Sequence, residues 1–169
     1  MTIHDLRCNI VNPFEIEDGK LRNLFSFFLH SAPTIQSTST TNIAHDRLSI
    51  NWKTYIEDEW NPNPYEFIPS LSNPEFPTDP KILNDYGLAD TSKVSRKHSA
   101  FICMKHNDEE DYACLLRHIR NAIAHKHVYF NNAGNRKYIY MEDYNKKNKT
   151  VIILINQTKL DALIKTITK

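Results

Sequence analysis

The sequence predicts a mainly α-helical domain with a small C-terminal β-hairpin and a terminal helix. Apolar residues recur at helical spacing over much of the chain, whereas runs of strand-forming residues occur only near its end. The 169 residues include three glycines. No two of them lie close enough for a P-loop or a G-x-G-x-x-G turn, which excludes the common nucleotide-cradling loops. The length is typical of one domain, which we expect to span residues 1–169.

The first helix is expected to begin after Asp18, a suitable N-cap residue, and to end at Pro33. Its apolar stripe consists of Leu21, Leu24, Phe25, Phe28 and Leu29. A Ser/Thr-rich loop is expected over 34–41, followed by a second helix over 41–60.

Six of the eight prolines lie within residues 61–80. Because proline fixes φ and lacks a backbone N–H, this density excludes a helix interior or a central strand. Interleaved aromatic and aliphatic residues predict a loop packed on the body of the protein. The same segment could also cover a site.

The rest of the chain is expected to contain further helices and a C-terminal β-hairpin. The hairpin is expected over 137–156, with a polar turn at 145–148. We expect helices over 81–86, 93–104 and 108–127, strands over 137–141 and 150–155, and a last helix capped by residues 156–158.

Charge is distributed unevenly along the chain. Residues 1–92 carry 6 Lys and Arg against 13 Asp and Glu, whereas residues 93–169 carry 15 against 7. A basic C-terminal half favours a polyanionic partner such as nucleic acid. Attraction between the two halves within one fold explains the same pattern equally well.

The helix expected over 108–127 carries the most informative residues. One side is apolar, and the opposite arc holds Cys114, Arg117, His118, Asn121, Ala124 and His125. A merely solvated face would more often show Glu, Lys and Gln. The small Ala124 would let a second surface approach closely.

The string Arg120-Asn121-Ala-Ile-Ala-His125 resembles the signature of the HEPN superfamily, in which Arg precedes His by four to six intervening residues. The resemblance implies a helical bundle that dimerises and cleaves RNA without a metal or another cofactor. Arg120 and His125 would then be the catalytic pair, with Asn121 beside them. Arg117, Lys126 and His127 would bind RNA. In some HEPN toxins a modified Tyr stands two residues after the His, where this chain has His127, so neutralisation by that route is not expected.

This chemistry is reasonable for these side chains. RNA carries its own nucleophile, the 2′-OH, so cleavage needs a proton-transfer group and a cation for the charge on phosphorus. Histidine titrates near neutrality and suits proton transfer. Arginine stays charged and can bind phosphate oxygens with two hydrogen bonds. Asn121 could orient the His125 imidazole or hold a phosphate oxygen.

A homodimer is expected on geometric grounds. Arg120 and His125 are five residues apart, about 140° around an ideal helix, and do not easily converge on one phosphate. Local unwinding near His125, or a second copy across a two-fold axis, would bring such groups together. An RNA substrate and an antitoxin protein are the expected partners of a toxin or phage-defence effector. No membrane segment is expected, which suggests the cytoplasm.

The same sequence features are compatible with functions other than a ribonuclease. The same residues would serve a non-catalytic HEPN module that binds a nucleotide, RNA or a protein partner. A zinc site would draw on the Cys/His-rich stretch, although its members lie partly on one continuous helix. That stretch comprises His98, Cys103, His106, Cys114, His118, His125 and His127. A serine hydrolase is disfavoured because the chain has no G-x-S-x-G elbow.

Overall fold

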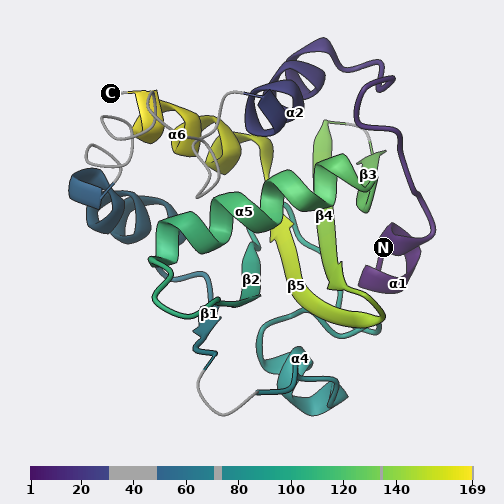
Figure 1. Ribbon diagram of the computed structural model, residues 1–169. Coiled ribbons are helices and arrows are strands. Elements are labelled where there is room, and N and C mark those ends of the chain that lie inside the picture. Colours follow the sequence, from purple (N-terminus) through teal and green to yellow (C-terminus); the bar gives the residue numbers. More distant parts are fainter. Residues whose placement is uncertain (31–48, 71–73, 134, 169) are drawn as a thin grey trace.

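The computed structural model describes residues 1–30, 49–70, 74–133 and 135–168 (Figure 1). Its centre is a five-stranded sheet, so the prediction of a mainly α-helical bundle is wrong. The strand order is β1-β2-β5-β4-β3. The strands are β1 (Tyr65–Ile68), β2 (Ala100–Met104), β3 (Val128–Ala133), β4 (Arg136–Asn145) and β5 (Asn148–Ile155). Only β1 and β2 pair in parallel, and the other neighbours are antiparallel.

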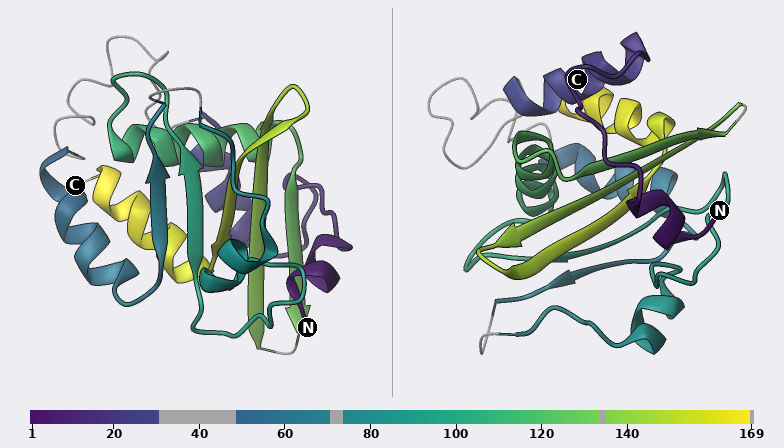
Figure 2. Two further views of the ribbon diagram at one scale, coloured as in Figure 1. Left: turned by 90° about the horizontal axis from the view of Figure 1, so that it is seen from below. Right: turned by 90° about the vertical axis from the view of Figure 1, so that its right-hand side faces the viewer.

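Helices cover both faces of the sheet (Figure 2). One face packs against α2 (Gly19–His30), α5 (Asp111–Ala124) and α6 (Gln157–Thr168), and its core includes Phe101 and Ile153. The other face lies under α1 (Ile3–Arg7) and α4 (Pro80–Asp85), with Ile102 and Leu154 in a second core. Every second residue of a strand faces the same core.

Burial on both faces of the sheet explains why the sequence did not predict β2. Residues 100–104 are Ala-Phe-Ile-Cys-Met, of which the first four are buried. A strand buried on both faces shows no alternation of apolar and polar residues, so the run was expected to end a helix over 93–104. Residues 128–133 were expected to form no element, yet β3 pairs with β4 along its whole length.

Elements whose ends are marked in the sequence by a capping residue or a turn were predicted correctly. Asp18 caps α2, because its carboxylate accepts a hydrogen bond from the Leu21 backbone N–H at 3.1 Å. Asn156 caps α6 in the same way, because its side-chain oxygen accepts a hydrogen bond from the Lys159 backbone N–H at 2.9 Å. The hairpin of β4 and β5 turns at residues 145–148, as expected. The short helix expected at 81–86 is α4.

The described part of the proline-rich segment contains more regular secondary structure than the expected loop. It contains β1, which lies at the edge of the sheet where proline neighbours are tolerated. Pro80 opens α4, and the preceding Asp79 accepts a hydrogen bond from the Lys81 N–H at 2.9 Å. Of the second expected helix, 49–55 is helical and continues into η1 (Ile56–Trp60), a π-helical turn. The loop over 34–41 and the start of that helix lie outside the described residues.

Candidate functional site

The motif lies at the C-terminal end of α5, which runs across the sheet (Figure 1). The helix ends in a Schellman motif, in which the N–H of His127 donates to Ala122 O at 2.8 Å and that of Lys126 to Ile123 O at 3.1 Å. Lys126 has a φ of 59°, the left-handed conformation that this cap requires. The ending turns the chain into β3 and leaves His125 at the C-cap.

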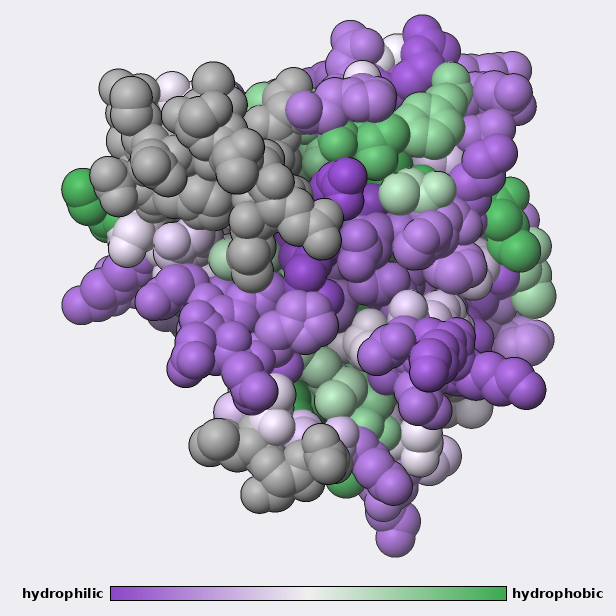
Figure 3. All heavy atoms as spheres, viewed as in Figure 1, coloured by the Kyte–Doolittle hydropathy of each residue, from purple (hydrophilic) through white to green (hydrophobic). Residues whose placement is uncertain are grey.

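The expected polar arc of α5 is divided in two. Cys114 and His118 are fully buried against the sheet, whereas Ala124 and His125 are exposed. Arg117, Arg120 and Asn121 are half-buried between them. The surface over α5 is mainly hydrophilic (Figure 3). The sheet therefore covers a wider sector of the helix than its apolar stripe.

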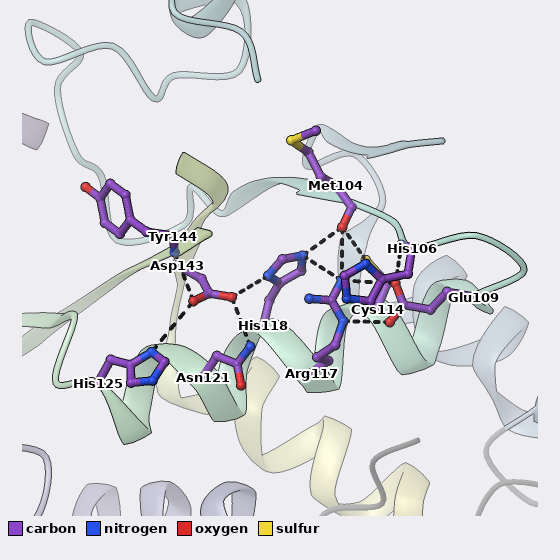
Figure 4. A network of polar contacts seen from close by, with 10 residues as sticks. All are labelled: Met104, His106, Glu109, Cys114, Arg117, His118, Asn121, His125, Asp143 and Tyr144. Carbon is purple, nitrogen blue, oxygen red and sulfur yellow. Dashed lines mark hydrogen bonds and ion pairs between the residues drawn. The ribbon is translucent and has the colours of Figure 1, made fainter. Parts of the chain in front are cut away.

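Asp143 of β4 joins the two parts of this arc (Figure 4). Its side chain is 4% exposed, and one oxygen, Oδ2, accepts hydrogen bonds from His118 Nδ1 at 2.9 Å and from Asn121 Nδ2 at 3.2 Å. The other oxygen, Oδ1, accepts the Tyr144 backbone N–H at 2.9 Å. It also lies 4.0 Å from Nδ1 of His125. One buried carboxylate thus contacts the last two turns of α5.

His118 is held from both ring nitrogens. Nε2 lies 2.8 Å from the carbonyl oxygen of Met104, at the end of β2. Both partners are acceptors and favour a hydrogen on each nitrogen, whereas the guanidinium of Arg117, with Nη2 3.2 Å from Nε2, opposes a positive charge on the ring. Burial opposes this charge, but the hydrogen bonds to Asp143 and Cys114 outweigh it and raise the pKa of His118. Burial also opposes ionisation of Asp143, but the hydrogen bonds from His118 and Asn121 outweigh burial and lower the pKa of Asp143.

The orientation of Asn121 follows from the same carboxylate. Asp143 can only accept hydrogen bonds, so the amide nitrogen of Asn121 must point toward it. The amide oxygen then points away from Asp143, as Figure 4 shows. The side chain therefore offers a hydrogen-bond acceptor on the outer side of the helix.

His125 lies at the exposed end of this network. Its side chain is 61% exposed. Its backbone N–H still donates to Asn121 O at 2.9 Å, so the helical hydrogen bonding continues to His125 without unwinding before it. The ring of His127 lies 6.1 Å from that of His125 and packs edge-on against Tyr144 at 5.2 Å.

Arg117 was expected to bind RNA, but its guanidinium is bound within the protein. Its Nε lies 2.7 Å and its Nη2 3.1 Å from the two oxygens of the buried Glu109, and Nη2 also donates to Met104 O at 3.2 Å. Burial disfavours the ionised carboxyl of Glu109. The hydrogen bonds that it accepts from Arg117 and from the His106 backbone N–H outweigh burial and lower its pKa. The guanidinium fixes the loop before α5.

Arg120 differs from Arg117. Within the described part of the chain, no hydrogen bond or ion pair engages its guanidinium. It lies on α5 apart from the Asp143 cluster, so Asn121 and His125 share a carboxylate and Arg120 does not. Lys126 is exposed beside His125, at the end of the helix.

Sequence reasoning missed Asp143 and Glu109 as members of this network. Glu142-Asp143 is an acidic pair inside a strand otherwise rich in apolar and aromatic residues, and both residues are buried. Buried carboxylates are rare without partners, which is the signal that could have marked them. In the described residues, no group of three or more His, Cys, Asp or Glu side chains is arranged to hold a metal ion.

The spacing of Arg120, Asn121 and His125 on this helix is the feature in which the sequence resembles the HEPN superfamily, and the chain belongs to that superfamily. Within that class, the model of the HEPN pEK499 p136 family matches residues 1–169, so the protein is a member of this family. No curated protein and no solved structure matches the chain. In the described residues, none of the helices is long and apolar enough to cross a membrane.

Proposed function

We propose that the protein is a metal-independent endoribonuclease whose active site contains Arg120, His125 and Asn121. The observation that carries the proposal is the exposed His125 imidazole beside the buried carboxylate of Asp143. A histidine near a carboxylate is suited to proton transfer. The guanidinium of Arg120, on the same helix, has no partner among the described residues and can bind a phosphate.

The roles follow from the chemistry of each group. His125 transfers a proton to or from the 2′-OH or the departing 5′-oxygen, and Arg120 binds the phosphate oxygens that gain negative charge. The amide oxygen of Asn121 points away from Asp143 and accepts a hydrogen bond from the attacking 2′-OH. This role differs from the two expected from the sequence, because the amide nitrogen that could hold a phosphate oxygen donates to Asp143 instead of facing outward. Lys126 and His127 lie next to His125 and contact the RNA backbone.

A homodimer completes the site in this proposal. The hydrogen bond from the His125 N–H to Asn121 O keeps the helix regular, which argues against local unwinding as the way to bring Arg120 and His125 together. A second copy across a two-fold axis would place Arg120 of one chain near His125 of the other. The exposed Ala124 permits close approach of the two helices.

The test is RNA cleavage by the purified protein in EDTA. We expect cleavage by the wild type and at least about a hundredfold loss in His125→Ala and Arg120→Lys. His4→Ala and Arg96→Lys are the matched controls, because both residues are exposed and neither lies on α5 or on the helices packed beside it. RNA binding without cleavage would contradict the enzyme and support a binding module.

The shared site has its own test. Arg120→Ala and His125→Ala proteins are each expected to be inactive, and co-refolding them should restore part of the activity, because some heterodimers contain one intact pair. A monomer at micromolar concentration with full activity would contradict the dimer. The family resemblance extends the proposal to a toxin or phage-defence effector restrained by an antitoxin protein. Expression should then arrest growth, and His125→Ala should abolish the arrest.

A further inference from the structure

The face of the sheet opposite α5 holds a second charged cluster, centred on Glu142. This residue precedes Asp143 on β4 and is fully buried on the side of α1 and α4. Its Oε1 lies 3.0 Å from Arg7 Nε and 2.9 Å from Lys149 Nζ. Burial disfavours its ionised form, but Lys149 and the hydroxyl of Tyr144 outweigh burial and lower the pKa of Glu142. The carboxylate is therefore charged.

The cluster has more hydrogen-bond donors than acceptors. The hydroxyls of Tyr140 and Tyr144 donate to Oε1 and Oε2 at 3.1 and 2.7 Å, so each oxygen of Glu142 already has partners. Arg7 has five N–H groups and gives one to Asp90 at 3.0 Å, and Lys149 gives one of its three to Glu142. The remaining donors need acceptors from outside the cluster.

A cavity of about 330 Å³ adjoins these donors. The side chains of Arg7 and Lys149 are 31% and 24% exposed, and both line it. Much of the remaining wall is apolar and includes Phe76, Leu83 and Ile152. The volume is in the range of small-molecule sites, which combine an apolar wall with a few polar groups. The sheet separates this cavity from α5.

We propose that this cavity binds a small organic anion. Its acceptor-rich head meets the N–H groups of Arg7 and Lys149 that have no acceptor in the described part of the chain, and its apolar body lies against Phe76, Leu83 and Ile152. Among the described residues that line the cavity, Asp90 is the one acidic residue; its side chain is 57% exposed, and its charge opposes an anion. The site is independent of RNA cleavage and does not rest on the proposed ribonuclease activity.

The probe for the test is 1-anilinonaphthalene-8-sulfonate, which carries an anionic head on apolar rings and fluoresces when bound. Fluorescence titration of the full chain should show one saturable site. Substituting Arg7 or Lys149 would remove one of the two cations beside the buried Glu142, so the charge is better changed at other residues of the lining. Asp90→Asn should tighten binding about threefold, and Thr91→Glu should weaken it by a similar factor, as expected for one unit charge at about 6 Å in a watery environment.

Asp85→Asn is the matched control, because it changes the net charge as Asp90→Asn does but lies outside the cavity lining. Its affinity should equal that of the wild type. Inorganic phosphate supplies the anionic head alone and should compete only weakly. The proposal is overturned by the absence of a saturable site, by equal affinities of the Asp85 and Asp90 variants, or by phosphate binding as tightly as the probe.

Discussion

Replacing Asp143 with asparagine should destabilise the protein by about 3 kcal/mol. Removing one partner of a buried ion pair typically costs about 3–5 kcal/mol, because the other charge is left without compensation. His118 relieves part of this cost by losing its proton near neutral pH, so the lower end applies. The replacement amide also cannot accept from both His118 and Tyr144, because only one of its two polar atoms is an acceptor. For a chain of this size the midpoint of thermal unfolding should fall by about 6–12 °C.

Urea unfolding followed by circular dichroism measures this change. Asp85→Asn, at an exposed position of α4, is the control and should stay within about 0.5 kcal/mol of the wild type. A double-mutant cycle with His118→Gln should give a coupling energy of at least about 1.5 kcal/mol. Equal stability of Asp143→Asn and the wild type, or additive effects in the cycle, would refute the pairing of His118 with Asp143.

Two further predictions concern stability. Glu109 and Glu142 have pKa values below 4.5 in the folded protein, so the unfolded chain binds protons first as the pH falls. The free energy of unfolding should therefore drop below about pH 4.5, with a shallower drop in Glu142→Gln; a flat profile in urea titrations would contradict these shifts. Lys126→Gly should stabilise the protein by about 0.5–1 kcal/mol, because glycine adopts the left-handed conformation freely, while RNA binding weakens. Lower stability of this variant would show that the Lys126 side chain stabilises the cap.

Short-range features of the sequence were sufficient to predict the helix ends and the hairpin. Asp18 and Asn156 cap their helices through bonds that span three residues, so the sequence around each contains the whole interaction. The hairpin of β4 and β5 is local in the same sense. By contrast, β2 is stabilised by pairing with β1 and β5, the latter about fifty residues away in sequence. Its own composition does not distinguish such a strand from a buried helix.

In the candidate site too, residues close in sequence could be predicted and contacts between distant residues could not. Arg120, Asn121 and His125 lie on one helix, and their spacing was visible in the sequence. The contacts of Asp143 with His118 and Asn121 span 25 and 22 residues and depend on how α5 packs on β4. The burial of Arg117 against Glu109 could not be predicted either, since a cation on the polar side of a helix is ordinarily solvated.

The chemistry of the RNA ends tests the central claim most directly. Cleavage through the 2′-OH, with His125 as the proton-transfer group, leaves a 2′,3′-cyclic phosphate or 3′-phosphate on one fragment and a 5′-hydroxyl on the other. We predict these ends for the wild type in EDTA, and none above background for His125→Ala. Fragments with 3′-hydroxyl and 5′-phosphate ends, formed only when a divalent metal is added, would contradict a metal-independent Arg120/His125 site.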